Sequence, residues 1–298
     1  MAELGVMIEA QEGLDWDQWR RIVADAERLG FAALRTSDHC FSVMGVTSRH
    51  SLAAWPALAL AAEWSSRIQL APMVSPITFY QPAMLARFAR AVDELAGGGR
   101  VMVGVGTGWY QGEHEAFGLP FPSLSERFRL LEEGIDRIRR TLEDHPLPFL
   151  IGARGEKKGL PLVARHASEW NTMAMDADSY RAKADVLAEC CRSVGRDPGE
   201  IRHSVMSGYL IGRDQADLRE RAARFGRFMP GMEASSPDEV LAGLRQRFFV
   251  GTPEDFIGRI RPLAQAGVSL FMFQHFLYED SDALELLASE VMPAVQAM

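Results

Sequence analysis

An aspartate–histidine pair and a short acidic segment carry the side chains best suited to proton transfer in this sequence. Asp38 and His39 follow an apolar run at 31–34 and its polar exit. An imidazole takes up and releases protons near neutral pH, so His39 is a candidate general acid or base. A histidine after a strand can equally hold its loop through its ring nitrogens, and the sequence leaves both roles open. Glu113 lies in a polar cluster that could supply a carboxylate but also suits the start of a helix.

A glycine-rich segment offers a place for a ligand to approach the backbone. The apolar run 101–105 leads into Gly106, Thr107 and Gly108, and the wide aromatic Trp109 follows. Glycine has no Cβ, so another molecule can lie close to the main chain there. The segment taken alone is equally compatible with an ordinary turn at the end of a strand.

A second glycine-rich segment has the chemistry of a phosphate site. Residues 152–158 read Gly-Ala-Arg-Gly-Glu-Lys-Lys and precede a predicted helix. Backbone N–H groups at a helix start attract anions, and Arg154, Lys157 and Lys158 add positive charge in an acidic protein. A glycine-rich turn with solvated lysines is the less favoured alternative.

Composition and motifs exclude several other classes of function. The net charge of −8 and the absence of a basic stripe argue against nucleic acid or an anionic membrane as partner. We expect no metal site, because His, Asp and Glu lack ligand spacing, and we find no nucleophile elbow. Three cysteines without framework spacing, no apolar run of membrane length and no signal-like N-terminus predict a cytoplasmic protein.

The elements that must position these residues alternate between strand and helix along the chain. In the predicted helix 82–95, Leu85, Phe88, Ala89, Val92 and Leu95 form the expected buried face. Alternation predicts a parallel sheet, and eight units in about 250–300 residues predict an α/β fold of the (β/α)₈ TIM-barrel type. A doubly wound sheet is the rival, but its glycine fingerprint after the first strand is absent. The expected strands are 4–8, 31–34, 68–74, 101–105, 148–151, 170–174, 201–211 and 268–273.

No linker interrupts the pattern, so a single domain is expected over 1–298. Two features depart from a regular barrel. Only 143–146 separate the fourth helix from the residues leading into the fifth strand, and 226–250 form an irregular insertion before the eighth strand, with a short helix near 237–245.

The ordered set of motifs resembles the luciferase-like monooxygenase superfamily, in particular its branch that uses the deazaflavin coenzyme F420. The resemblance covers nearly the whole chain and is more specific for the superfamily than for the cofactor. The motifs that carry it are Leu-Gly-Phe at 29–31, Ser-Asp-His at 37–39, Ala-Pro-Met-Val-Ser-Pro at 71–76, Tyr-Gln-Pro at 80–82, the segment 95–109, Glu-His-Glu-Ala-Phe-Gly-Leu at 113–119, Ser-Glu-Arg-Phe-Arg-Leu-Leu-Glu at 125–132, Ile-Gly-Ala-Arg-Gly-Glu-Lys at 151–157 and Val-Gly-Arg-Asp-Pro at 194–198.

The resemblance implies a flavin-type ring in the mouth of the barrel and a phosphate at the loop after the fifth strand. It implies a non-proline cis peptide bond near the end of the third strand, and it matches His39 to the active-site histidine of the family. The catalytic candidates are His39, Trp109 and Glu113. The cofactor-binding candidates are Asp38, Pro72, Met73, Val74, Gly106, Thr107, Gly108, Gly152, Ala153, Arg154, Gly155, Glu156 and Lys157.

Two departures from the family pattern shape the functional hypothesis. Trp109 stands where F420-dependent sugar-phosphate dehydrogenases carry an acid, so that substrate class is not expected. The short connection at 143–146 predicts an open mouth, or one covered by 226–250 or by a neighbouring subunit, which leaves a homodimer as an open expectation. The leading hypothesis is hydride transfer between F420 and a small organic substrate. The alternatives are an FMN-dependent monooxygenase, a non-catalytic flavin-binding barrel and an unrelated barrel for a sugar phosphate.

Overall fold

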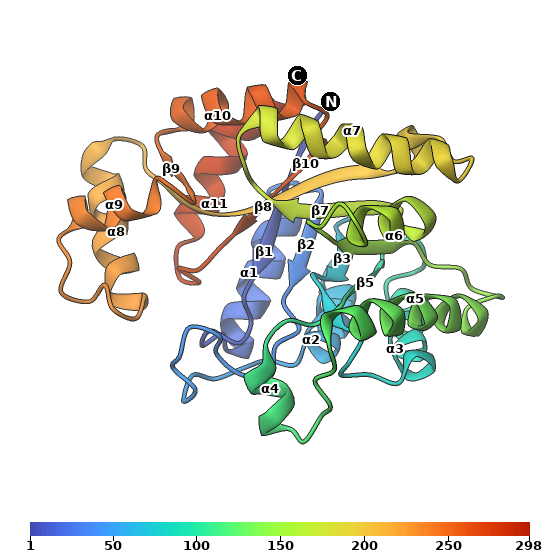
Figure 1. Ribbon diagram of the computed structural model, residues 1–298. Coiled ribbons are helices and arrows are strands. Elements are labelled where there is room, and N and C mark those ends of the chain that lie inside the picture. Colours follow the sequence, from blue (N-terminus) through green and yellow to red (C-terminus); the bar gives the residue numbers. More distant parts are fainter.

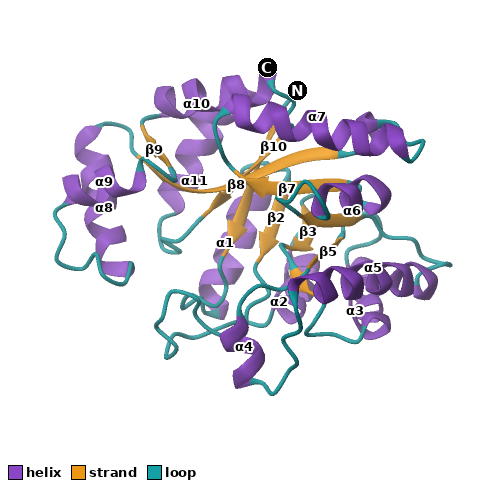
Figure 2. Cartoon of the chain, viewed as in Figure 1, coloured by secondary structure: helices purple, strands orange, loops and turns teal.

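The expected strands form a parallel barrel in the computed structural model, which describes residues 1–298 (Figures 1 and 2). Hydrogen bonds order them β3-β2-β1-β10-β8-β7-β6-β5-β4, and an isolated parallel bridge between Leu70 and Val101 joins the two ends. The TIM-barrel prediction is therefore confirmed. The strands are β1 (Glu3–Ile8), β2 (Ala33–Thr36), β3 (Gln69–Pro72), β4 (Ser75–Pro76), β5 (Val103–Gly106), β6 (Phe149–Gly152), β7 (Glu169–Met173), β8 (Arg202–Ile211), β9 (Phe249–Gly251) and β10 (Leu270–Gln274).

The third barrel position is made of two short strands where the sequence predicted one. β3 pairs with β2, β4 pairs with β5, and the peptide bond between Met73 and Val74 that separates them is cis. This is the position at which the family resemblance places a non-proline cis bond. Pro72 ends β3, as its missing N–H requires.

Helices follow the strands around the outside of the barrel. Asp15 caps the first of them by accepting a hydrogen bond from the Gln18 N–H. The helices are α1 (Trp16–Arg28), α2 (Ala54–Trp64), α3 (Pro82–Leu95), α4 (Gln111–Ala116), α5 (Leu124–Thr141), α6 (Gly159–His166), α7 (Ala177–Ser193), α8 (Gln215–Phe228), α9 (Pro237–Leu244), α10 (Pro253–Gln265), α11 (Ser281–Leu286) and α12 (Met292–Gln296), with a 3₁₀ turn at Pro198–Glu200 and a π-helical turn at Leu287–Val291.

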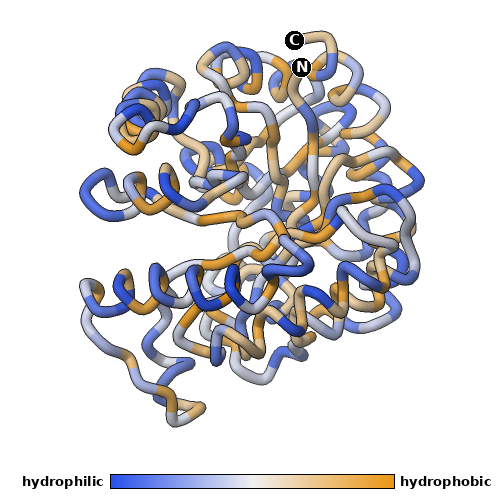
Figure 3. Tube along the Cα trace, turned by 90° about the vertical axis from the view of Figure 1, so that its right-hand side faces the viewer, coloured by the Kyte–Doolittle hydropathy of each residue, from blue (hydrophilic) through white to orange (hydrophobic).

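Apolar side chains fill both the barrel and the layer between barrel and helices. A cluster of 64 buried residues joins the strands to the surrounding helices, and the apolar segments in Figure 3 run mainly along the central strands. The predicted buried face of α3 is too wide: Leu85, Ala89 and Val92 are buried, whereas Phe88 and Leu95 are 40% and 53% exposed. Helical spacing marks a stripe but not where its edge lies, and these two residues lie beyond it.

The short helix expected near 237–245 is confirmed as α9, whereas the strand β9, at the end of the insertion at 226–250, was not predicted. β8 is ten residues long, and its last three residues, from Tyr209, leave the barrel and pair with β9. Helices α8 and α9 pack on this extension around a separate core of nine residues that includes Leu218 and Phe225. The resulting unit, 209–251, is called the lobe below and stands at one side of the barrel (Figure 1).

The direction of the strands and the lengths of their connections determine at which end of the barrel a site can form. The connection from α5 to β6 spans only 142–148, as the sequence predicts. The carboxyl ends of the strands point toward α4 and the loop after β2, whereas the two chain termini lie together at the opposite end (Figure 1). In no helix is there an apolar stretch of the length needed to cross a membrane.

Candidate active site

His39 and Glu113 form the central contact at the carboxyl ends of the strands. His39 lies in the loop after β2 and Glu113 in α4, and the His39 Nδ1 atom is 2.7 Å from Glu113 Oε2. The Cys40 N–H donates to the other oxygen of Glu113 at 2.5 Å. The carboxylate is buried and the imidazole is 14% exposed. Glu113 therefore fixes the orientation of the ring and leaves Nε2 as the nitrogen for other partners.

The surroundings of His39 favour its protonated form. Burial lowers the pKa of His39, but the hydrogen bond and the charge of Glu113, with the charges of Glu9 and Asp38, outweigh burial and raise the pKa above its ordinary value. The raised pKa favours the protonated imidazole, which can act as a proton donor in the mouth.

Asp38 points into a different network from its neighbour His39. Its carboxylate accepts hydrogen bonds from the Ser75 hydroxyl and from the Tyr80 hydroxyl, the latter at 3.0 Å. Burial is the largest influence and raises the pKa of Asp38, while the two hydroxyl donors and His39 oppose it. These two hydrogen bonds connect the loop after β2 to β4 and to the segment before α3. Asp38 therefore holds the loop after β2 in position. The sequence contained no spacing signal for the role of Tyr80.

Aromatic side chains extend outward from His39. Trp109, which is 63% exposed, meets the His39 ring edge-on at 5.6 Å and lies 5.3 Å from Tyr110. Phe41 contacts Tyr110 edge-on at 5.9 Å and stacks with Phe117 at 6.4 Å. These four residues, Trp109, Tyr110, Phe41 and Phe117, are called the aromatic strip. The predicted catalytic candidates thus meet, but Phe41 and Phe117 were missed because their partners lie far apart in sequence.

The glycines of β5 have an explanation within the protein itself. A Cβ on Gly104 would overlap the Pro72 carbonyl oxygen, and one on Gly106 would lie 2.6 Å from Val74 Cγ2. The absent Cβ atoms admit the β3–β4 segment, where the sequence suggested an approaching ligand. Gly108 has a φ of +73°, a backbone conformation that favours glycine.

Val74 brings the predicted cofactor segments together. Its methyl groups face Gly106 and Gly152, so the ends of β4, β5 and β6 meet around this one half-buried side chain. Met73 is buried among the apolar residues inside the barrel, and Thr107 is half-buried at the end of β5.

The loop between β6 and α6 presents free donors to solvent. Gly152, Arg154, Gly155, Glu156 and Lys157 are exposed, and Ala153 is half-buried. None of the backbone N–H groups of 154–158 has an acceptor within the protein. Glu156 pairs with Lys183 at 2.8 Å, and Lys158 donates to Ser125, whereas Arg154 and Lys157 have no side-chain partner.

Polar side chains from β1 and β10 complete the rim. Glu9 accepts hydrogen bonds from the side-chain amides of Gln11, at 2.9 Å, and Gln274, at 2.5 Å. His275, the neighbour of Gln274, is directed elsewhere and contacts the Tyr209 hydroxyl at 2.6 Å. Burial lowers the pKa of His275 to about 4, so this second histidine is neutral near pH 7.

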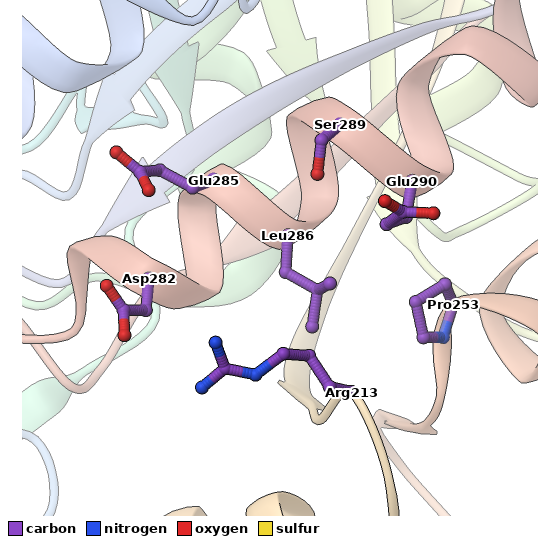
Figure 4. Close-up of a pocket in the computed structure, with 7 residues that line it drawn as sticks. All are labelled: Arg213, Pro253, Asp282, Glu285, Leu286, Ser289 and Glu290. Carbon is purple, nitrogen blue, oxygen red and sulfur yellow. The ribbon is translucent and has the colours of Figure 1, made fainter.

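A cleft of about 440 Å³ lies on the flank of the barrel, away from these residues (Figure 4). Asp282, Glu285 and Glu290 line it from α11 and the turn after it, and Arg213 faces them. Arg213 pairs with Asp217, and Glu285 with Arg28. None of the predicted site residues lines this cleft. No group of three or more His, Cys, Asp or Glu side chains is arranged for a metal ion.

Comparison with known proteins finds, over most of the chain, the family that the sequence motifs resemble. Residues 1–270 match the family model described as luciferase-like monooxygenase. An FMNH(2)-dependent dimethylsulfone monooxygenase from Pseudomonas fluorescens (strain Pf0-1) is 26% identical, with 98% of this chain and 91% of that protein covered. An F420-dependent hydroxymycolic acid dehydrogenase from Mycobacterium tuberculosis (strain ATCC 25618 / H37Rv) is 28% identical, with 95% and 87% covered.

A solved structure shares the fold along the whole chain. An F420-dependent secondary alcohol dehydrogenase in complex with an F420–acetone adduct superposes with a TM-score of 0.81 at 20% identity, covering 99% of each chain. At that identity the likeness concerns the fold alone.

Proposed function

The chain belongs to the luciferase-like monooxygenase family, and we propose that it is an oxidoreductase that transfers hydride between the coenzyme F420 and a small organic substrate. The observation that carries the proposal is the buried His39–Glu113 pair at the mouth of the barrel. Relatives that use F420 and relatives that use FMN both match this chain, so the choice of F420 is part of the proposal.

The loop between β6 and α6 fits the phosphate of either cofactor. Its backbone N–H groups at 154–158 have no acceptor in the protein, and they precede the first turn of α6. Arg154 and Lys157 supply positive charge that no carboxylate of the protein neutralises. Free donors, a helix start and unpaired cations together favour an anion.

The ring of the cofactor would lie where Val74 meets the ends of β5 and β6. Because Gly106 and Gly152 lack a Cβ, the Val74 side chain packs against both strand ends and would form one wall of the ring site. When bound, the deazaflavin supplies the hydride or accepts it, because the cofactor carries the redox chemistry and the protein orients it.

His39 would move the proton that accompanies hydride transfer at an oxygen-bearing carbon. Its Nε2 atom can donate to a carbonyl oxygen or accept from a hydroxyl, while Nδ1 stays bonded to Glu113. Reduction of a carbonyl requires the protonated ring, and oxidation of an alcohol requires the neutral ring. The two directions should therefore show opposite pH dependence through the raised pKa of His39.

Titration of the purified protein with F420 and with FMN tests the cofactor. We expect tighter binding of F420, and a weaker affinity for it in Lys157→Ala and Arg154→Ala. Arg181→Ala is the matched control, because Arg181 is an exposed arginine already paired with Asp178 on α7. Tighter binding of FMN would favour the monooxygenase alternative. Binding of either cofactor without turnover of any alcohol or carbonyl would favour a non-catalytic barrel.

Three expectations remain predictions. A homodimer is tested by light scattering of the purified protein. A cytoplasmic location is tested by fractionation of the source cells. A single domain over 1–298 predicts one cooperative unfolding transition.

A further inference from the structure

The outward side of helices α2 and α3 is apolar, and it borders the residues that hold the loop after β2. We propose that a second copy of this chain covers this side and thereby fixes Tyr80, and with it the loop that carries His39. The inference concerns assembly and positioning, so it does not rest on the proposed function. The surface, called the α2–α3 face below, consists of Pro56, Leu60, Met84, Phe88 and Leu95, which are all exposed.

Helix α2 lacks the polar side that a helix on the outside of a barrel needs. Apart from Glu63, its eleven residues are alanine, leucine, proline and tryptophan. Trp55 and Leu58 are buried against the barrel, whereas Pro56 and Leu60 face outward. A helix that is apolar on every side is typical of a helix that is covered on every side.

Helix α3 continues the same surface. Met84, Phe88 and Leu95 recur on one side of it at helical spacing, and with Leu60 they are between 36% and 53% exposed. No helix other than α3 carries more than one exposed large hydrophobic residue. A groove of about 330 Å³ lies between α2 and α3, and seven of its eight lining residues are hydrophobic. Contiguous exposed apolar surface of this kind marks a site of protein association.

The charges of the two helices favour a second copy as the partner. Arg90 is paired with Glu94 and with Asp144 on the neighbouring connection, and Asp93 is buried against His145. Glu63 and Arg87 remain, and both are exposed.

Neither Glu63 nor Arg87 has a partner in the protein. In a two-fold dimer the same surface meets itself, so Arg87 can pair with Glu63 of the partner subunit, twice over. A different protein would have to supply an acid and a base at matching places, whereas a copy of the chain brings both.

Tyr80 connects the groove to the candidate active site. Its ring lines the groove and meets Phe88 edge-on at 6.4 Å. Its hydroxyl donates to Asp38 at 3.0 Å, and His39 is the next residue. A partner that fills the groove therefore restrains the ring whose hydroxyl holds the loop after β2.

Sedimentation equilibrium of the wild type and of one face variant tests the surface. We expect the wild type to be a dimer at about 100 µM, and Phe88→Glu to weaken the dimer more than tenfold because it places a charge in the apolar contact. Val194→Glu is the matched control, since Val194 is an exposed apolar residue at the end of α7 and should leave the dimer intact. A monomeric wild type, or equal dimer affinity in wild type and a natively folded Phe88→Glu, would overturn the proposal.

A charge exchange tests whether the partner is the same surface of a second copy. Arg87→Glu and Glu63→Arg should each weaken the dimer about tenfold, because each brings like charges together. The double variant Glu63→Arg/Arg87→Glu should return to within about threefold of the wild-type affinity. Single variants without effect, or a double variant weaker than both single ones, would refute the pairing.

Hydrogen exchange measured by mass spectrometry tests the connection to the loop that carries His39. Exchange in 37–48 should become about threefold faster or more in the dissociated Arg87→Glu protein and should return toward the wild-type rate in the double variant. Tyr80→Phe should accelerate the same exchange without dissociating the dimer, because it removes the hydroxyl that binds Asp38. Equal exchange in monomer and dimer would refute the connection. Neither measurement uses a cofactor or a substrate, so failure of the proposed function would leave both results unaffected.

Discussion

Replacement of Glu113 by glutamine is the sharpest test of the role assigned to His39. Glutamine keeps the size of the side chain but removes the charge, and its single oxygen can accept from the His39 Nδ1–H or from the Cys40 N–H but not replace both carboxylate oxygens. The wild-type contact is 2.7 Å long and Glu113 is 1% exposed, so solvent screens it little. A hydrogen bond to a charged group contributes about 1.5–3 kcal/mol, and this is the energy by which the protonated form of His39 should lose stabilisation.

Two measurements report the change. NMR titration of the His39 ring should show its pKa moving downward in Glu113→Gln. The pH profile of kcat/KM for carbonyl reduction should lose activity at a lower pH than in the wild type, because the protonated ring disappears earlier. Glu115→Gln on the same helix is the matched control, since Glu115 is exposed and bonded only to Gln111.

The same pair makes stability depend on pH with a definite sign. The pKa of His39 is raised in the folded protein, so the pair stabilises the fold fully below the ordinary histidine pKa of about 6.5. That contribution is lost as pH rises through the raised value, and it should be smaller in Glu113→Gln. A pKa of His39 that stays the same in Glu113→Gln, or that falls equally in Glu115→Gln, would refute the reasoning.

Further predictions concern packing, a buried ion pair and thiol reactivity. Gly106→Ala should lower the free energy of unfolding in urea by about 1–3 kcal/mol, because the new Cβ would lie 2.6 Å from Val74 Cγ2. Arg49→Ala should cost about 3 kcal/mol in the same assay, since it leaves the fully buried Glu12 carboxylate without its cation. Cys40 should react with iodoacetamide at pH 8 on the order of a thousandfold more slowly than an ordinary cysteine, as followed by peptide mass spectrometry, because burial raises its pKa to about 12.

Matched controls accompany these variants. Gly258→Ala in α10 meets nothing within 4 Å and should stabilise the helix by about 0.5–1 kcal/mol. Arg21→Ala breaks an exposed pair with Glu279 and should cost under about 1 kcal/mol. The packing explanation would be contradicted if Gly106→Ala lost less free energy of unfolding than Gly258→Ala. The buried-pair explanation would be contradicted if Arg49→Ala and Arg21→Ala lost equal amounts. Rapid alkylation of Cys40 in the native protein would contradict the raised pKa of its thiol.

Local sequence patterns were sufficient for most of the barrel. Apolar runs of strand length and the cap at Asp15 depend on neighbours in the chain, and the structure confirms them. β9 was missed because its three residues carry no pattern of their own and are strand only through pairing with the distant end of β8. Phe88 and Leu95 were misplaced because helical periodicity gives the direction of a face and not its width.

The candidate site was predictable as a set of residue types but not as a set of contacts. His39 and Glu113 were both identified, yet 74 residues separate them and only the barrel brings them together. The glycines of β5 illustrate the reverse case. In the sequence they suggested a backbone left open for a ligand. In the structure the missing Cβ atoms of Gly104 and Gly106 make room for Pro72 and Val74, and the sequence gives no sign of that close approach.

The separate core of the lobe has a consequence for the loop that carries His39. A unit held by nine core residues, beside a cluster of 64, can open by local unfolding well before the barrel does. Arg49 ties the loop after β2 to this unit through the Phe228 carbonyl. Opening of the lobe would break this contact, so we expect amide hydrogen exchange in the loop that carries His39 to become faster whenever the lobe opens.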